Sequence, residues 1–556
     1  MRIVECVPNF SEGRDQRVID AIAGAVEAVD GVTLVDVDPG ESTNRTVMTI
    51  VGPPESVLEA AFLAISKATE LIDMRAHSGA HARQGATDVC PFVPVAGVSM
   101  EECVALAKAL GERVGAELQI PVYLYGEAAT RPERRSLQDV RAGEYEGLET
   151  KLASPEWSPD FGPPTFNARS GATAIGARKF LIAYNVNLNT SNAKLAKAVA
   201  WRIRDSEGPT RTPEGKLVRD GDGKLVRTPG LFEHCKATGW YISDYGCAQV
   251  TMNLTDYSIT PIHTVFDACC EIAAELGVRV TGSEIVGLVP REALTDAGAH
   301  YFLRQGSSPG APDTDLVDMA VRSLGLNDVA TFDPSKKVIE EVLRDRGAMI
   351  ERSLGTFADL TSAGTLVPGG GSVAAASAAL SASLLAMVAN LSYGAKGLEA
   401  KRESHAELSR RSQSLKAELL SAVDLDSKAY LGVVKARRLP RKSDEDKAAR
   451  SRAIEEANLR AAQVPMSVLE RTIDLLELAD HLVDSGMEAT ISDTGVAACA
   501  AAAAADGACY NVLINLSGIA DETHTAQLRA RALDLNERAH RLADDIRGVL
   551  LGRLSE

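Results

Sequence analysis

The amino-acid composition changes sharply near residue 350, and this change sets the fold class of each half. Residues 352–556 hold 3 of the 23 prolines and 4 of the 25 aromatic residues. Their long runs of Ala, Leu, Glu and Arg favour helix, because these side chains lose little freedom there and proline is rare. The second half is therefore predicted to be an all-α helical bundle, whereas residues 1–351 need another architecture.

The first half alternates between β-rich stretches and amphipathic helical patterns. The order strand, helix, strand, strand, helix, strand occurs twice, which predicts an α/β (α+β) half made of two ferredoxin-like βαββαβ subdomains, each a helix layer on a mixed sheet. The predicted strands are 2–7, 32–38, 45–51, 121–125, 179–188, 240–245, 248–254 and 284–289, and the helices are 15–28, 55–71, 191–205 and 261–277. The predicted domains are 1–177, 178–327, a linker at 328–351, and 352–556.

Charge and cysteine content narrow the function classes. The chain has 556 residues and a net charge of -17, which argues against nucleic acid or an anionic membrane as a partner. Its nine cysteines include no CxxC pair, so a zinc ribbon is not expected. We expect the cysteines to be reduced thiols in a cytoplasmic protein. The N-terminus does not look like a signal peptide. Residues 373–391 are apolar over the length of a membrane span, but their Ala and Ser content favours a buried bundle helix.

A dense polar cluster lies in DMRAHSGAHARQGATDVCPF, residues 73–92. Its glycines predict a loop that follows a helix, and such loops commonly hold site residues. His77 and His81 have a spacing seen in metal pairs, but glycine breaks the required helix and no third ligand is evident. Acid–base chemistry at a His and an ordinary hydrogen-bonded His are the other interpretations.

Two further segments of the first half are ambiguous. DVDPGESTNRT places Asp36, Asp38, Asn44 and Arg45 around a turn, either as plain turn residues or as a carboxylate that orients a His and an Arg that receives a substrate carboxylate. The Gly- and Pro-rich stretch at 161–180 offers backbone donors and loosely resembles an anion-binding loop.

In the second half, PGGGS at 368–372 opens a long apolar helix, with Ser372 as a predicted N-cap and glycines that let a ligand approach the backbone. Asp424 and Asp426 lie two apart in a helical pattern, so their directions differ by ~200°. A desolvated Asp would have a raised pKa and could shuttle protons.

At this point the motifs resemble a known family. VECVPNFSEG, VDPGESTNRT, IDMRAHSGAHARQGATDVCPF and RAGEYEGL resemble the glutamate formimidoyltransferases. VPGGGSVAAASAALSASL, VDLDSKAY, SDTGVAA and YNVLINL resemble the cyclodeaminase domain of the formimidoyltransferase-cyclodeaminase family. The chain departs from the family pattern at 206–238, which reads as a longer, exposed insertion.

The resemblance implies a bifunctional folate enzyme of histidine degradation. The first domain would transfer a formimidoyl group from N-formimidoyl-L-glutamate to tetrahydrofolate, and the second would cyclise the product to 5,10-methenyl-tetrahydrofolate with release of ammonia. Tetrahydrofolate would act as co-substrate, without a metal, in a cytoplasmic homo-oligomer built from dimers. The alternatives are a formyl-donor transferase or folate cyclase and a non-catalytic folate-binding scaffold.

The resemblance also implies site residues. The catalytic His of the family falls on His81, with Asp38 to orient it, and the cyclodeaminase carboxylate falls on Asp426. Arg45, Arg75 or Arg83 would bind the glutamate carboxylates, a choice that the sequence leaves open. The expected folate-binding residues are Gly162, Pro163, Pro164, Thr165, Phe166, Asn167, Ala168, Arg169, Ser170, Gly171, Arg45, Gly369, Gly370, Gly371 and Ser372.

Overall fold

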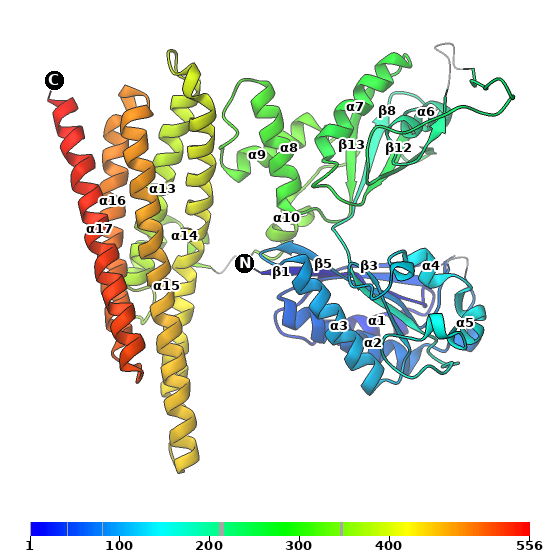
Figure 1. Ribbon diagram of the computed structural model, residues 1–556, viewed down its shortest axis with the longest axis horizontal. Coiled ribbons are helices and arrows are strands. Elements are labelled where there is room, and N and C mark those ends of the chain that lie inside the picture. Colours follow the sequence, from blue (N-terminus) through cyan, green and yellow to red (C-terminus); the bar gives the residue numbers. More distant parts are fainter. Residues whose placement is uncertain (1, 42, 80–81, 211–215, 345–347, 556) are drawn as a thin grey trace. The chain divides into compact units, whose positions relative to one another are not determined.

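The computed structural model describes residues 2–41, 43–79, 82–210, 216–344 and 348–555. The chain divides into two compact units. The first unit comprises residues 1–290 and 333–343, and the second comprises 291–332 and 344–556. Each unit has its own secondary-structure class, so each is described by itself (Figure 1).

A mixed sheet organises the first part of the first unit. Within the described residues it has seven strands. The short strands β1 and β2 both lie between β4 and β5, so the order across the sheet is β3, β4, β1 and β2, β5, β7, β6. The strands are β1 (Ile3–Cys6), β2 (Asn9–Phe10), β3 (Thr33–Gly40), β4 (Arg45–Gly52), β5 (Thr87–Ala96), β6 (Val122–Gly126) and β7 (Thr173–Ala177). The β1, β2, β3, β4 and β5 pairings are antiparallel, whereas β7 runs parallel to both β5 and β6.

Helices cover both faces of this sheet. On β6, Val122 and Leu124 belong to the core beneath α1 (Gln16–Glu27), α2 (Pro54–Leu71) and α3 (Met100–Glu117). The alternate residue Tyr123 belongs to a second core with α4 (Leu137–Arg141) and α5 (Glu144–Leu152). Because successive strand side chains point to opposite faces, the two cores lie on opposite sides of the sheet.

A second, four-stranded sheet follows in the first unit. Its order is β11-β12-β8-β13, and all its pairings are antiparallel. The elements are β8 (Ile182–Leu188), α6 (Ala193–Ile203), β11 (Cys235–Ile242), β12 (Cys247–Leu254), α7 (Ile262–Glu275) and β13 (Val280–Val286). Between α6 and β11, the short strands β9 (Gly208–Pro209) and β10 (Arg227–Thr228) pair with each other. The short helices α10 (Pro334–Lys337) and α11 (Ile339–Val342) also belong to this unit.

The second unit is built from helices, and those from residue 370 onward are long and run side by side (Figure 1). They are α8 (Arg291–Arg304), α9 (Asp313–Ser323), α12 (Leu354–Ser362), α13 (Gly370–Gly394), α14 (Arg402–Arg437), α15 (Asp444–Ser485), α16 (Ile491–Leu516) and α17 (Glu522–Leu554). Alanines of α13 and α16 fill much of the core, where their small size lets helices approach closely. By length and composition alone, α13 and α16 would suffice to cross a membrane, although a core helix passes the same test.

The coarse fold prediction is confirmed: the N-terminal region combines mixed sheets with helices, and the C-terminal region is mostly helical. The loop predicted over 73–92 is wrong from Thr87 onward, where the structure has the inner strand β5. Pro91 and Pro94 hid this strand, because proline cannot donate to a ladder and normally marks an edge strand. The strand at 121–125 exists as β6, but it lies at an end of the sheet and pairs with β7.

Candidate functional site

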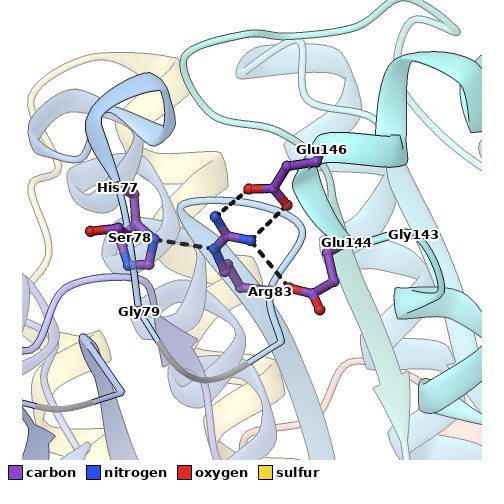
Figure 2. Close-up of a pocket in the computed structure, with 7 residues that line it drawn as sticks. All are labelled: His77, Ser78, Gly79, Arg83, Gly143, Glu144 and Glu146. Carbon is purple, nitrogen blue, oxygen red and sulfur yellow. Dashed lines mark hydrogen bonds and ion pairs between the residues drawn. The ribbon is translucent and has the colours of Figure 1, made fainter.

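A cavity of about 550 Å³ opens in the first unit, beside the loop that follows α2. Its volume falls in the range of small-ligand pockets. The residues that line it are His77, Ser78, Gly79, Arg83, Gly143, Glu144 and Glu146 (Figure 2). The cavity therefore joins the predicted polar loop to the start of α5, some 60 residues further along the chain.

Arg83 lies at the centre of this cavity, with its side chain only 9% exposed. Its Nη1 and Nη2 atoms donate to the two carboxylate oxygens of Glu146 at 2.8 and 2.7 Å, and Nη1 also donates to Glu144 at 3.2 Å. The Glu146 contact raises the pKa of Arg83, and the same contact lowers the pKa of Glu146. The site thus holds a charged guanidinium between two carboxylates.

His77 holds the other side of the same guanidinium. The Nε atom of Arg83 donates to Nδ1 of His77 at 3.2 Å, while Nε2 of His77 lies 2.9 Å from the backbone oxygen of Asn44. Since that oxygen can only accept, Nε2 carries the ring proton and Nδ1 is the acceptor. His77 is therefore a neutral imidazole in this arrangement, and it ties Arg83 to the turn before β4.

The turn at Asn44 fixes the first part of the loop. The Asn44 amide donates to the backbone oxygen of Ser78 at 3.0 Å and accepts from the backbone N–H of Gly13 at 3.0 Å. Gly79 packs so closely on the backbone of Thr43 that a Cβ there would overlap its carbonyl oxygen. Both ends of the loop are thereby anchored, at His77–Gly79 and at Arg83.

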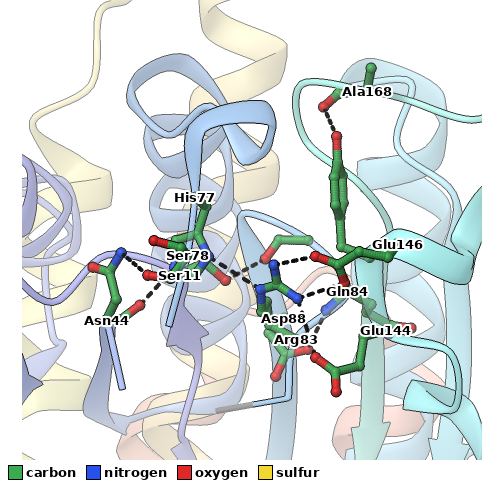
Figure 3. Close-up of polar contacts among 12 residues, drawn as sticks. Ser11, Asn44, His77, Ser78, Arg83, Gln84, Asp88, Glu144, Glu146 and Ala168 are labelled. Carbon is green, nitrogen blue, oxygen red and sulfur yellow. Dashed lines mark hydrogen bonds and ion pairs between the residues drawn. The ribbon is translucent and has the colours of Figure 1, made fainter. Parts of the chain in front are cut away.

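The start of α5 connects this cavity to the predicted folate-binding segment. Tyr145, between the two glutamates, donates its backbone N–H to the Arg83 oxygen at 2.8 Å. Its hydroxyl donates to the backbone oxygen of Ala168 at 2.5 Å (Ala168 is labelled in Figure 3). Its ring packs against Phe166 with the centroids 5.5 Å apart. The structure therefore brings the segment 162–171 next to the Arg83 cavity, as a shared site requires.

The segment 162–171 owes its shape to local backbone hydrogen bonds. The side-chain oxygen of Asn167 accepts from the N–H groups of Arg169 and Ser170, and Gly171 adopts a positive φ of 67°. The Arg169 guanidinium donates to the backbone oxygens of Thr69 and Glu70 at the end of α2. Arg169 thus attaches the segment to α2, and these bonds leave the rest of the segment exposed or partly exposed except at its last two residues.

Asp38 and Arg45 lie opposite Val47 and Gly40 respectively on the paired strands β3 and β4. Asp38 is exposed, whereas Arg45 is half-buried, and burial lowers the pKa of its guanidinium despite the nearby charge of Asp38. Asp88 contributes to the same electrostatic environment and accepts hydrogen bonds from the Gln84 backbone and from Arg141. The charged groups of Asp38, Arg45 and Asp88 are therefore close enough to interact electrostatically.

Three other polar residues of the 73–92 segment are His81, Arg75 and Gln84. His81 lies outside the described residues. Arg75 is exposed, and both its Nε and its Nη2 donate to the carboxylate of Asp73, which raises the pKa of Arg75. Gln84 is 1% exposed, and its side-chain amide has no hydrogen-bond partner among the described residues (Figure 3).

Glu144 and Glu146 were not among the residues predicted from the sequence. Both lie in RAGEYEGL, a motif that carries the family resemblance. Two acidic residues at i and i+2 around an aromatic residue were the available signal, but nothing local indicated that they would contact Arg83.

A second cluster of site residues lies in the second unit, where the start of α13 meets α14. The hydroxyl of Ser372 lies 2.9 Å from a carboxylate oxygen of Asp426, 3.0 Å from the backbone oxygen of Val423 and 3.1 Å from the hydroxyl of Ser427. Burial raises the pKa of Asp426, an effect that hydrogen bonds from Ser372 partly offset. Asp426 is therefore a partly buried carboxyl group held in one orientation, as proton transfer requires.

The predicted N-cap role of Ser372 is wrong. Helix α13 starts at Gly370, its N-cap is Gly369, and Ser372 lies inside the first turn, fully buried. Its hydroxyl instead binds Asp426, 54 residues away, which no local pattern revealed. Asp424 points elsewhere and accepts the backbone N–H of Met349 at 2.8 Å, consistent with the predicted divergence of the two acids.

Gly371 is required by the close approach of Asp426. A Cβ at this position would overlap the Asp426 carboxylate. We expect Gly371→Ala to displace that carboxylate and to lower by roughly 10²-fold the turnover of the cyclisation that the resemblance implies, since misplacing a reacting group by about 1 Å has an effect of this size. Steady-state kinetics with 5-formimidoyl-tetrahydrofolate measures this, with Gly394→Ala, at the open end of α13, as the matched control. Equal rates for the two variants would contradict the assignment.

In the parts of the chain that the structure describes, no group of three or more His, Cys, Asp or Glu residues is arranged to hold a metal ion. In the first cluster Arg83 is hydrogen-bonded to Glu144, Glu146 and His77, and in the second Asp426 is hydrogen-bonded to Ser372. Such arrangements suit acid–base and recognition chemistry.

The chain matches known families over most of its length. Residues 3–178 match "Formiminotransferase domain, N-terminal subdomain", residues 183–344 match "Formiminotransferase domain", and residues 353–534 match "Formiminotransferase-cyclodeaminase". These three ranges contain the Arg83 cavity, the second sheet and the Asp426 cluster, respectively.

Curated relatives cover the whole chain or one of its halves. The chain is 42% identical to formimidoyltransferase-cyclodeaminase of Rattus norvegicus, over 99% of each chain. It is 42% identical to glutamate formimidoyltransferase of Streptococcus pyogenes serotype M1, over 54% of this chain and 93% of that protein. It is also 33% identical to methenyltetrahydrofolate cyclohydrolase of Methylorubrum extorquens, over 33% of this chain and 92% of that protein. From its two sites and these full-length similarities, the chain belongs to the formimidoyltransferase-cyclodeaminase family.

Proposed function

We propose that the chain catalyses two successive reactions of histidine degradation on one folate carrier. The first transfers the formimidoyl group of N-formimidoyl-L-glutamate to tetrahydrofolate. The second cyclises 5-formimidoyl-tetrahydrofolate to 5,10-methenyl-tetrahydrofolate and releases ammonia. The observation that carries this proposal is the 42% identity to a formimidoyltransferase-cyclodeaminase over 99% of both chains.

Formimidoyl transfer requires two proton movements at a tetrahedral carbon. A bond forms between the folate nitrogen and the formimidoyl carbon, and the bond from that carbon to the glutamate nitrogen breaks. The folate nitrogen loses a proton and the glutamate nitrogen gains one, and a single His can perform both steps in turn. We assign this role to His81, with Asp38 as the carboxylate that orients it. The anchored loop positions His77–Gly79 and Arg83 on both sides of residue 81 support the assignment.

The folate of the transfer step is assigned to the segment 162–171 and Arg45. The contacts of Tyr145 with Phe166 and Ala168 support this, because they join the segment to the Arg83 cavity. A half-buried guanidinium such as Arg45 suits an anionic group of either substrate.

Cyclisation is assigned to Asp426 and the glycine-rich start of α13, residues 369–372. The bridging nitrogen of folate attacks the amidine carbon and loses a proton, while the departing nitrogen gains one and leaves as ammonia. A carboxyl group with a raised pKa can accept the first proton and supply the second. The close packing of the Asp426 carboxylate on Gly371 supports this assignment, because it places the carboxylate at the glycine-rich start of α13.

Finer features of the fold and assembly remain proposals. The antiparallel order β3-β4-β1-β5 in the first sheet, and β11-β12-β8-β13 in the second, supports two ferredoxin-like subdomains. We place these at 1–177 and 178–327, with a linker at 328–351 and a cyclodeaminase domain at 352–556. We further propose a cytoplasmic homo-oligomer built from dimers that uses no metal and binds neither nucleic acid nor membrane.

The decisive experiment is an assay of the purified full-length chain with tetrahydrofolate and either N-formimidoyl- or N-formyl-L-glutamate. We expect the formimidoyl donor to yield glutamate, ammonia and the absorbance of methenyl-tetrahydrofolate. No glutamate release from this donor would refute the transferase, and glutamate release without ammonia would refute the cyclodeaminase. Release from the formyl donor alone would favour a formyltransferase, and folate binding without turnover would favour a scaffold.

A further inference from the structure

The cavity around Arg83 holds two carboxylates that make unequal contacts. Both oxygens of Glu146 accept from Arg83, at 2.7 and 2.8 Å, in a two-pronged ion pair. Glu144 accepts a single bond from Arg83, at 3.2 Å from Nη1 to its Oε2 atom, which leaves its Oε1 atom outside the ion pair. Glu146 is therefore committed to Arg83, whereas Glu144 keeps an acceptor for something else.

The backbone directs Glu144 into this position at a cost. Gly143 and Glu144 have positive φ angles of 88° and 53°, and for a residue with a Cβ this left-handed conformation is strained. The strain persists because the next residue, Tyr145, donates its backbone N–H to the backbone oxygen of Arg83 and so holds this turn in place. The Glu144 side chain lines the cavity and is 47% exposed, so a ligand can reach it (Figure 2).

The chemistry of the two donors differs at one group. A formimidoyl group is an amidine, which is a cation near neutral pH and presents N–H donors in the same planar fork as guanidinium. A formyl group is neutral and presents an oxygen that only accepts. A carboxylate that is short of donors attracts the first and repels the second, because charged hydrogen bonds are about twice as strong as neutral ones.

We propose that Glu144 is a specificity-determining residue, whose carboxylate binds the amidinium of the formimidoyl donor and thereby selects it over a neutral formyl donor. Glu146 and His77 keep the Arg83 side chain in place while this happens. This inference rests on the proposed transferase function and names the group that its site recognises. The carboxylate also keeps the amidine protonated, which makes its carbon the better electrophile for the folate nitrogen.

The test is Glu144→Gln, with kcat/KM for glutamate release measured for N-formimidoyl- and N-formyl-L-glutamate at saturating tetrahydrofolate. Loss of a charged hydrogen bond is expected to lower the formimidoyl-to-formyl preference by about 10- to 100-fold. The loss should fall on the formimidoyl donor, because the glutamine amide can donate to a formyl oxygen. Glu146→Gln is the matched control: it breaks the Arg83 pair and should weaken both donors alike.

Equal losses for both donors in Glu144→Gln, or no loss, would overturn the proposal. The melting temperature of the variant, by circular dichroism, reports whether the unit that carries Glu144 is folded. If the variant does not fold, inhibition of the unchanged chain decides: formamidinium should compete with the donor, and formamide should compete at least tenfold more weakly. Equal inhibition would overturn the proposal, whereas an unchanged chain that releases no glutamate from the formimidoyl donor refutes the transferase itself.

Discussion

Replacing Asp426 by Asn is expected to lower cyclodeaminase turnover by about 10²- to 10⁴-fold, the usual contribution of a positioned acid–base group. Asparagine keeps the shape of the side chain and can still accept from Ser372, but it cannot take or return a proton. Formimidoyl transfer, catalysed in the other unit, should be unchanged. Ammonia release from 5-formimidoyl-tetrahydrofolate and glutamate release from the donor measure the two activities separately.

Asp424→Asn supplies the control for this variant. Asp424 lies two residues before Asp426 on the same helix and accepts the Met349 amide rather than facing Ser372. It should leave cyclisation within a few-fold of the unchanged chain, since it alters only one hydrogen bond to the backbone. Loss of both activities in folded Asp426→Asn, or equal loss in Asp424→Asn, would contradict the assignment.

The pH dependence of the cyclisation rate should also reflect the ionisation of Asp426. Burial raises the pKa of Asp426 above the ordinary value of 3.8, and the ionised form is the proton acceptor. Cyclisation should therefore fall as the pH drops through this raised pKa, so that its acid limb lies above pH 3.8. In Asp426→Asn the residual rate should lose that limb, and a limb that persisted would belong to another group.

Replacing His81 by Ala is expected to lower formimidoyl transfer by about 10²- to 10⁴-fold while cyclisation of supplied 5-formimidoyl-tetrahydrofolate continues. The reason is the loss of the one group proposed to take a proton from folate and give one to glutamate. His77→Asn is the matched control from the same segment. Its side-chain oxygen can still accept from Arg83 Nε, so transfer should fall by no more than about tenfold.

These outcomes separate a catalytic from a supporting imidazole. Equal losses in His81→Ala and His77→Asn would mean that both residues only maintain the loop. Loss of cyclisation in folded His81→Ala would show that the two reactions do not use separate sites. The melting temperature of each variant, by circular dichroism, establishes whether it is folded.

Much of the architecture could be predicted because it follows from local preferences. The helices at 15–28 and 55–71 and the strand at 45–51 were found within a residue or two, since their apolar periods reflect one buried face. The helical second half followed from composition alone. The strand β5 was missed because it contains prolines, which locally argue against an inner strand. It forms nevertheless, because pairing with the neighbouring strands β1 and β7 outweighs this local preference.

The candidate sites show the same division. Sequence alone determined which residue types are available: the motif around His81, the glycines before α13, and the acids Asp424 and Asp426 with their opposed directions. Only the tertiary structure decided the partners, since it joins Arg83 to Glu146 and Ser372 to Asp426, which are 63 and 54 positions apart in the chain. Local propensity acts within a few residues, whereas a hydrogen bond between distant segments exists only after the sheet and the helices have packed, so no pattern along the chain could specify it.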